Sequence, residues 1–305
     1  MPENRYTIID LGSNSFHMLT VLKTDNGFSV FSKSKKKVRL ATGLDAKQNL
    51  STETMVSGWS CLQQFRDELD QIKPCKILVT ATAALRIAKN RQIFIKKAET
   101  ILQHPIKLIS GIEEATTIYR GVTYTEKITK KMLIIDIGGA STELIIGKGN
   151  DILLAKSLNM GCVTWLNQYF ADGNLNSNNF NNAVYMAKKV IAPQVKNYIE
   201  QGWSITMGAS GTIQAVREIN NKQQINKELT LDLLNKMKKM CIGCENIHAL
   251  SIDGLKKSRI PVFASGLAIL IALFESLNIK SLTPSKGALR EGLISTLLEN
   301  TSPSS

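Results

Sequence analysis

Residues 136–143 (DIGGASTE) have the residue types and spacing expected of a turn that binds phosphate. Apolar runs precede and follow this stretch, which predicts a strand, a tight turn and a second strand. Glycines lack a Cβ atom, so backbone N–H groups can approach an anion, and the flanking carboxylates can hold the accompanying metal ion. A plain Gly-Gly hairpin has the same local pattern, so this turn alone does not establish a site.

Residues 10–15 (DLGSNS) repeat that arrangement about one domain length earlier, again after an apolar run. In both copies an acid and a Gly/Ser turn lie at the end of a predicted strand. Such a repeat predicts duplicated halves that face each other across a cleft. Two phosphate-binding turns directed at one ligand arise by chance much less often than one.

Three further segments place polar residues after predicted strands. Residues 110–115 (SGIEEA) enter a helix, where Glu113 and Glu114 either complement the helix dipole or supply a general base at a strand-to-helix junction. Residues 80–86 start a helix and project Arg86. Residues 208–212 (GASGT) form a third Gly/Ser turn before a helix, whose free N–H groups favour anions.

The elements that must position these residues form two similar halves. In the first, we expect strands at 6–10, 16–23 and 28–40, a hairpin turn at 26–27, and a helix capped by Ser51. A strand at 77–79, a helix at 93–102 capped by Asn90, a strand at 106–109 and a helix to about 121 follow. In the second, we expect strands around residues 136–143 and at 152–158, 203–207 and 282–284, helices at 163–170 and 183–199, and mostly helix beyond 229.

The polar, basic segment 124–131 is the predicted hinge. We therefore assign residues 1–125 to the first domain and 126–305 to the second, with a C-terminal helix at 286–299 that can pack back on the first. Residues 301–305 are predicted to be a frayed end. The apolar stretch 260–277 is interrupted by Pro261, Ser265, Gly266 and Glu275, so we expect a buried helix rather than a membrane span.

The composition limits the class of protein. A chain of 305 residues that is 43% hydrophobic can form one large or two ordinary domains. No secretory signal is evident, which predicts a cytoplasmic protein with five reduced cysteines. Cys241 and Cys244 have metal-ligand spacing but lack a second pair. The net charge of +13 favours polyanions such as nucleotides, polyphosphate or nucleic acid.

Eight motifs resemble, in order, those of the exopolyphosphatase and guanosine pentaphosphate phosphohydrolase family, within the actin, Hsp70 and sugar-kinase superfamily. They are DLGSNSFHM (10–18), ATAALR (81–86), SGIEEA (110–115), DIGGASTEL (136–144), MGCVTWL (160–166), MGASGT (207–212), SGLAIL (265–270) and GALREGL (287–293). The resemblance implies an α/β protein of two duplicated RNase H-like domains with an active-site cleft between them. Ala140 and residues 162–166 and 252–255 look more like the guanosine pentaphosphate branch, in a short form that ends after the second domain.

The resemblance implies Mg²⁺-dependent removal of a terminal phosphate by water. Guanosine pentaphosphate is the first candidate substrate and inorganic polyphosphate the alternative; a sensor that binds either without hydrolysis is a third reading. No membrane partner is expected, nucleic acid is disfavoured, and a homodimer stays open.

The same resemblance implies a role for each site residue. Glu114 would be the general base, with Glu113 as the alternative, and Arg86 would stabilise charge on the terminal phosphate. Asp10, Asp136 and Glu143 would hold Mg²⁺ directly or through waters. The phosphate-binding residues would be Gly12, Ser13, Asn14, Ser15, Gly138, Gly139, Ser141, Thr142, Gly208, Ser210 and Gly211. We interpret His17 as a packed or edge histidine, and Arg290 and Glu291 either as pairing with neighbours or as acting at the domain interface.

Overall fold

A computed structural model describes residues 4–25, 27–225 and 228–299. The chain divides into two compact units: unit 1 contains residues 1–124 and 289–305, and unit 2 contains residues 125–288. Asn26 of the predicted hairpin turn and the predicted frayed end at 301–305 lie outside the described residues. The assignment of domains to 1–125 and 126–305 stays a prediction.

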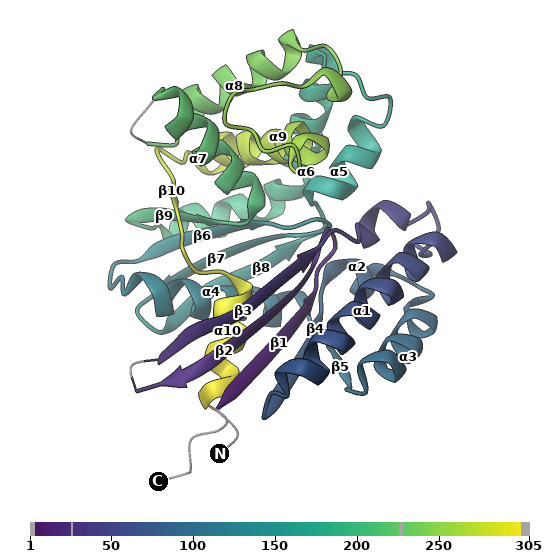
Figure 1. Ribbon diagram of the computed structural model, residues 1–305. Coiled ribbons are helices and arrows are strands. Elements are labelled where there is room, and N and C mark those ends of the chain that lie inside the picture. The colour runs from purple at the N-terminus through teal and green to yellow at the C-terminus, as the bar shows by residue number, and fades with distance from the viewer. Residues whose placement is uncertain (1–3, 26, 226–227, 300–305) are drawn as a thin grey trace. The chain divides into compact units, whose positions relative to one another are not determined.

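Unit 1 contains a five-stranded sheet in the order β3-β2-β1-β4-β5 (Figure 1). Its strands are β1 (Arg5–Leu11), β2 (Phe16–Thr24), β3 (Gly27–Lys36), β4 (Lys76–Ala81) and β5 (Ile106–Leu108). The first three are antiparallel neighbours, whereas β4 runs parallel to β1 and β5 parallel to β4. All five strands were predicted. The third is shorter than expected because the chain turns after it into a 3-10 helix, η1 (Leu40–Gly43).

The helices of unit 1 are α1 (Thr52–Ile72), α2 (Ala83–Ile87), α3 (Arg91–Leu102), α4 (Gly111–Glu126) and α10 (Leu289–Glu299). Ser51 caps α1 as predicted, because its side chain accepts from the N–H of Thr54. Asn90 is the N-cap residue of α3 as predicted, but its side chain makes no capping bond: its amide bonds instead to the backbone N–H and carbonyl of Leu50. Helix α4 is longer than expected and extends into the predicted hinge.

Helix α10 covers one face of the unit 1 sheet. Its apolar residues pack with alternate residues of β1 and β2 in a cluster formed by Tyr6, Ile8, Leu19, Val21, Leu293, Ile294, Leu297 and Leu298. Because side chains alternate between the faces of a strand, Asp10 follows Tyr6 and Ile8 on this face, and His17 precedes Leu19 and Val21 on it. The opposite face packs on α3, where the Phe16 and Phe94 rings are 6.3 Å apart.

Unit 2 repeats the sheet topology of unit 1. Its order is β10-β9-β6-β7-β8, formed by β6 (Met132–Ile137), β7 (Thr142–Lys148), β8 (Asp151–Leu158), β9 (Ile205–Ala209) and β10 (Thr283–Pro284). Strands β6 to β8 are antiparallel neighbours, β9 runs parallel to β6 and β10 parallel to β9. The predicted α/β duplication is therefore confirmed.

The helices of unit 2 are α5 (Cys162–Tyr169), α6 (Ser177–Gln201), α7 (Gly211–Gln223), α8 (Leu231–Gly243) and α9 (Ile260–Leu277), with a 3-10 helix, η2 (Ile247–Ala249). The predicted start of the second of these helices at residue 183 is wrong, because α6 begins at Ser177. Asn176 caps α6 by accepting from the N–H of Asn179, so the helix begins six residues earlier than expected. Asparagine is a poor residue within a helix but a good cap, and the sequence pattern did not separate the two uses.

Helix α9 is packed among α5, α6, α7 and α8. Among the described residues it alone is long and apolar enough to cross a membrane, and 78% of that stretch is buried within the protein. Pro261 lies in the first turn of α9, where a backbone N–H has no partner within the helix, so the N–H that proline lacks is not needed there. The prediction of a buried helix is confirmed.

Candidate active site

In unit 1, the buried Glu114 and the half-buried Arg86 form an ion pair near the ends of the parallel strands. Glu114 lies in the first turn of α4 and is 7% exposed. Arg86 Nη1 donates to Glu114 Oε2 at 3.0 Å and also to the carbonyl oxygen of Ile109 at 3.0 Å. Burial raises the pKa of Glu114 above its ordinary value, and the Arg86 guanidinium opposes that rise. Burial makes this carboxylate a stronger base than an exposed one, while the guanidinium favours its ionised form.

Glu113 has different surroundings although it is the next residue. Its side chain is 39% exposed and pairs with Lys107, with Oε1 and Nζ 2.5 Å apart. Successive residues on a helix point about 100° apart, so only one of the two carboxylates can face the buried side. This geometry favours Glu114 as the base, and the assignment stays a prediction.

Asp10 lies near the carboxyl end of β1 and is 8% exposed. Burial raises its pKa to about 7; the positive charge of Arg290 opposes this shift, and the negative charge of Glu114 adds to it. Among the described residues, its Oδ1 atom is buried without a hydrogen-bond partner. An isolated buried carboxylate oxygen is costly unless a ligand satisfies it.

The turn after Asp10 is tight and supported by its neighbours. A Cβ atom on Gly12 would lie 2.8 Å from the Ser15 carbonyl oxygen. Ser13 Oγ accepts from the N–H of Ala84 at 3.0 Å, so this hydroxyl ties the turn to α2. The carbonyl of Asn14 accepts from the N–H of Arg39 at 3.0 Å. These contacts hold the backbone of the predicted phosphate-binding turn in place.

In unit 2, the turn after Asp136 is held by the start of α5. The carbonyls of Gly138 and Gly139 accept from the N–H groups of Cys162 and Val163 at 2.9 and 2.8 Å. Because the C=O and N–H of one trans peptide point in opposite directions, the N–H groups of Gly139 and Ala140 point away from α5. Two neighbouring N–H groups with this orientation can bind an anion.

The polar side chains of this second turn are buried and engaged with the protein. Asp136 and Glu143 are direct partners across β6 and β7. Glu143 Oε1 accepts from Ser157 Oγ at 2.7 Å, and Thr142 Oγ1 donates to the Met160 carbonyl at 2.7 Å. Ser141 is also buried. Thr142 therefore stabilises the turn through its side chain, so a phosphate contact from it would have to come from the backbone.

The third turn, after β9, is joined to the second. Ser210 Oγ accepts from the N–H of Ile137 at 3.3 Å, and Ser210 has a positive φ of 87°. Gly208 has an internal role, because a Cβ atom there would lie 2.6 Å from the Ile213 and Leu282 side chains. Gly211 lies directly beneath the Arg259 guanidinium, which occupies the space that a Cβ atom would need.

Arg259, the N-cap residue of α9, was not predicted as a site residue. Among the described residues, no hydrogen bond or ion pair of its side chain is formed. Its charge also lowers the pKa of the Cys162 thiol, which burial raises overall to about 11. The sequence offered no signal for it, because Arg259 lies far from the turn it contacts.

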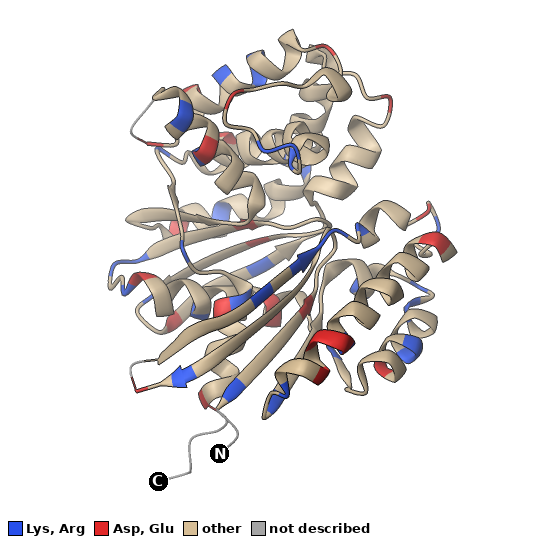
Figure 2. Ribbon diagram, viewed as in Figure 1, with Lys and Arg blue, Asp and Glu red and all other residues tan. Residues whose placement is uncertain are grey.

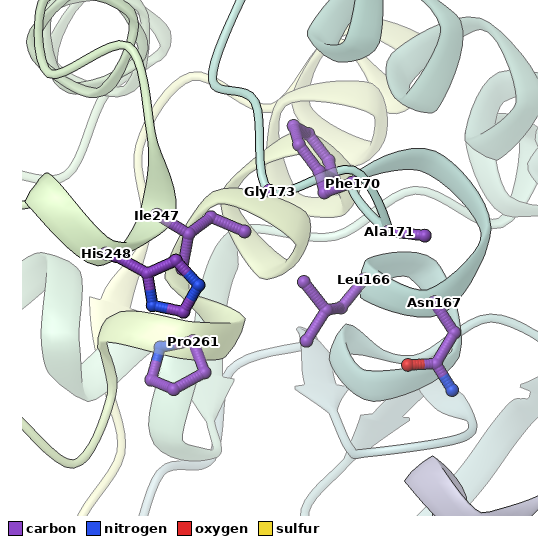
Figure 3. A pocket seen from close by; sticks show the side chains of 8 residues that line it. All are labelled: Leu166, Asn167, Phe170, Ala171, Gly173, Ile247, His248 and Pro261. Atoms are coloured by element: carbon purple, nitrogen blue, oxygen red, sulfur yellow. The ribbon is translucent and has the colours of Figure 1, made fainter.

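Unit 2 also has a mostly apolar pocket of about 380 Å³ between α5, η2 and the start of α9 (Figure 3). Figure 3 shows the His248 ring beside Pro261 on one side and Asn167 on the other. Leu166 and Phe170 add apolar surface. None of the predicted site residues lines this pocket.

In the ribbon, positions of Lys and Arg and positions of Asp and Glu occur along both units (Figure 2). The edge strand β3 carries Lys33, Lys35 and Lys36, which are all exposed. Lysines on an edge strand commonly prevent pairing with other chains. The net charge of +13 therefore does not identify a nucleic-acid surface.

The candidate carboxylates Asp10, Asp136 and Glu143 can be compared with what a magnesium ion requires. Among the described residues, no group of three His, Cys, Asp or Glu side chains lies together as a metal centre. Mg²⁺ usually keeps several waters and binds one or two carboxylates plus substrate phosphate. The buried Oδ1 of Asp10, which lacks a partner among these residues, suits such an ion.

Known proteins with similar sequences cover almost the whole chain. A guanosine-5'-triphosphate,3'-diphosphate pyrophosphatase of Vibrio cholerae serotype O1 is 48% identical over 295 residues, which are 97% of this chain and 59% of that protein. The protein of that name from Pseudoalteromonas translucida is 50% identical over 97% of this chain and 60% of its own length. The chain thus spans about 60% of the length of these relatives.

Solved structures show the same fold. An exopolyphosphatase from Cytophaga hutchinsonii aligns with a TM-score of 0.88 and 24% identity over 99% of this chain and all of that chain. A Ppx/GppA family member from Aquifex aeolicus aligns with a TM-score of 0.78 and 23% identity over 99% of this chain and all of that chain. The predicted fold class, that of two duplicated actin-like domains, is confirmed.

The sequence model of the Ppx/GppA phosphatase family matches residues 20–301. This match includes most of the chain and reaches into both repeated halves, and it agrees with the similarity to the named relatives. The chain belongs to the Ppx/GppA phosphatase family.

Proposed function

We propose that this chain hydrolyses the terminal phosphate of guanosine pentaphosphate. The observation that carries the proposal is the ion pair of the buried Glu114 with Arg86, in which the charge of Glu114 acts on the buried Asp10. Relatives at 48–50% identity that bear the name of this activity support the choice of substrate. The proposal concerns the activity of this chain, although those relatives are longer.

Glu114 orients the attacking water and accepts its proton. Its burial makes it a stronger base than an exposed glutamate, while Arg86 keeps it ionised. Arg86 has further N–H groups with which to bind oxygens of the terminal phosphate. Phosphoryl transfer leaves little covalent chemistry to the protein, so the rate depends on this positioning and on charge neutralisation.

The glycine turns bind the remaining phosphates through backbone N–H groups. The candidate residues are 12–15 in unit 1, and 138–142 and 208–211 in unit 2. Asp10, Asp136 and Glu143 would hold Mg²⁺, which when bound neutralises charge on the phosphate oxygens. We also propose that residues 1–125 and 126–305 are the two domains and that the protein is cytoplasmic. A homodimer is a further proposal for its assembly.

Inorganic polyphosphate is the second candidate substrate, because it would use the same atoms. The structural likeness to a protein named exopolyphosphatase makes it worth testing. Release of phosphate from both substrates, compared as kcat/KM with Mg²⁺ present, separates the two. We expect the higher value for guanosine pentaphosphate, and a higher value for long polyphosphate would overturn that choice. Tight binding of either without phosphate release would support a sensor.

A further inference from the structure

The C-terminal helix α10 brings a second arginine to the unit 1 site. Its apolar face packs on β1 and β2 through Leu293, Ile294 and Leu297. Gly292 packs so closely on α4 that a Cβ atom would overlap the Thr117 carbonyl oxygen. Together these contacts fix the first turn of α10, which carries Arg290, relative to the sheet and to α4.

Arg290 is held by a specific hydrogen bond to His17. Asp10 and His17 are direct partners across β1 and β2, so both lie on the face that α10 covers. Arg290 Nη1 lies 3.1 Å from His17 Nδ1. A guanidinium can only donate, so Nδ1 must be the acceptor and the ring proton must be on Nε2. The sequence-based interpretation of His17 as a packed or edge residue did not include this bond.

The remaining donors of Arg290 are available for a ligand. Within the described part of the chain, its side chain forms only the hydrogen bond to His17. Its charge acts on Asp10, yet Asp10 Oδ1 has no hydrogen-bond partner there. Arg290 is fixed at one nitrogen and does not bond the nearby Asp10 carboxylate. Its other N–H groups can therefore donate to a phosphate oxygen, while the carboxylate binds the cation that accompanies the phosphate.

We propose that Arg290 binds an oxygen of the substrate's phosphate chain beside Asp10, and that His17 is the positioning residue that orients Arg290 for this contact. The proposal rests on the phosphate site of the proposed function. It makes α10, which follows unit 2 in the chain, a part of the unit 1 site.

The first test observes the hydrogen bond without any substrate. The chain has three histidines, so ¹⁵N NMR of the labelled protein can assign the ring nitrogens of His17. We expect the Nε2–H tautomer in the wild type and a mixture of tautomers in Arg290→Gln. A His17 ring that is unaffected by Arg290→Gln would overturn the positioning role.

The second test measures binding of imidodiphosphate, a non-hydrolysable diphosphate, with Mg²⁺ by calorimetry. Loss of a charge-assisted hydrogen bond corresponds to roughly 10- to 100-fold weaker binding, which we expect for Arg290→Gln. His17→Phe keeps a ring but removes the acceptor, and should weaken binding several-fold. His17→Asn returns an acceptor near the Nδ1 position and should restore most of the affinity.

Two controls separate positioning from general damage. Arg120 is an exposed arginine on α4, so Arg120→Gln changes the net charge equally and should bind like the wild type. If His17 acts through Arg290, the double variant His17→Phe/Arg290→Gln should bind no more weakly than Arg290→Gln alone. Additive losses in the double variant would contradict the proposed coupling.

These measurements distinguish a failure of this inference from a failure of the proposed function. Imidodiphosphate binding by Arg290→Gln at wild-type affinity would overturn this inference, even if the enzyme hydrolyses guanosine pentaphosphate. The expected binding pattern without hydrolysis would support the inference and count against the proposed function alone.

Discussion

The two Gly/Ser turns that follow Asp10 and Asp136 have the same place in the same sheet topology, but their surroundings differ. The partner of Asp10 across the strands is His17, whereas the partner of Asp136 is Glu143. Around Asp10 lie Glu114 and the charge of Arg290. Duplication therefore conserved the position of the acid at the strand end, while the neighbours of each acid diverged.

This difference suggests a division of roles. In unit 1, groups that can transfer protons or bind phosphate come from α2, α4 and α10, which are separate segments of the chain. In unit 2, the N–H groups of Cys162 and Val163 hold the turn by its carbonyls, and Ser157 holds Glu143. We infer that the unit 1 turn lies among groups that can react, whereas the unit 2 turn is held rigidly by its own neighbours.

The largest expected effect tests the reactive role of unit 1. Glu114→Gln should reduce kcat by about 10²–10⁴-fold, because general-base catalysis contributes that much. Glu113→Gln is the matched control, since Glu113 pairs with Lys107 at the surface, and should change kcat less than about threefold. Phosphate release at saturating substrate measures both. Equal losses in the two variants would remove Glu114 as the base.

A second prediction concerns Asp10 and pH. Its pKa is about 7 in the folded state and 3.8 is the ordinary value, so the folded protein retains a proton that the unfolded chain releases as pH rises between these values. Below pH 3.8 Asp10 is protonated in both states and does not destabilise the fold. As the pH rises from there to about 7, the free energy of unfolding falls by on the order of 4 kcal/mol. Asp10→Asn should therefore raise Tm by several degrees at pH 8 without Mg²⁺, and by much less near pH 4.

Thermal unfolding at both pH values checks this, with Asp67→Asn on the exposed side of α1 as the control. Added Mg²⁺ should raise the Tm of the wild type more than that of Asp10→Asn. A gain in Tm that is the same at both pH values would show that the Asp10 charge is not its cause.

A third prediction tests the rigid turn of unit 2. A Cβ atom on Gly161 would overlap the backbone of Gly139 and Ala140, so Gly161→Ala should destabilise the protein by about 1–3 kcal/mol, as overpacking does. Gly243→Ala is the control, because a Cβ atom there meets nothing within 4 Å. Urea unfolding measures both variants. Equal stability of the two would mean that α5 does not hold the turn.

The smallest expected effect concerns Glu143. Ser157→Ala removes the hydroxyl that donates to Oε1, and we expect a loss of about 1–2 kcal/mol in the free energy of unfolding because the carboxylate is buried. Ser157→Thr retains the hydroxyl and should lose less. If both variants unfold at the wild-type urea concentration, Glu143 does not depend on Ser157.

Much of the fold was predictable because the relevant signals are local. The β-branched runs around residues 6–10 and 132–137 and the glycine turns after them identified both repeated halves. Ser51 was recognised as a cap because its partner Thr54 is three residues away. The same rule correctly placed Asn90 at the start of α3 but not its side chain, because its amide bonds to Leu50, which is distant in the sequence.

The sequence by itself determined the duplicated topology, the two acids at the strand ends and the pair of candidate bases, since each depends on spacing within one segment. The tertiary structure decided that Glu114 is buried and Glu113 exposed, because that depends on what packs against α4. It also placed Arg259 against Gly211 and Arg290 against His17, 273 residues apart. No local pattern encodes such a contact; it exists only once the C-terminal helix has packed on the first two strands.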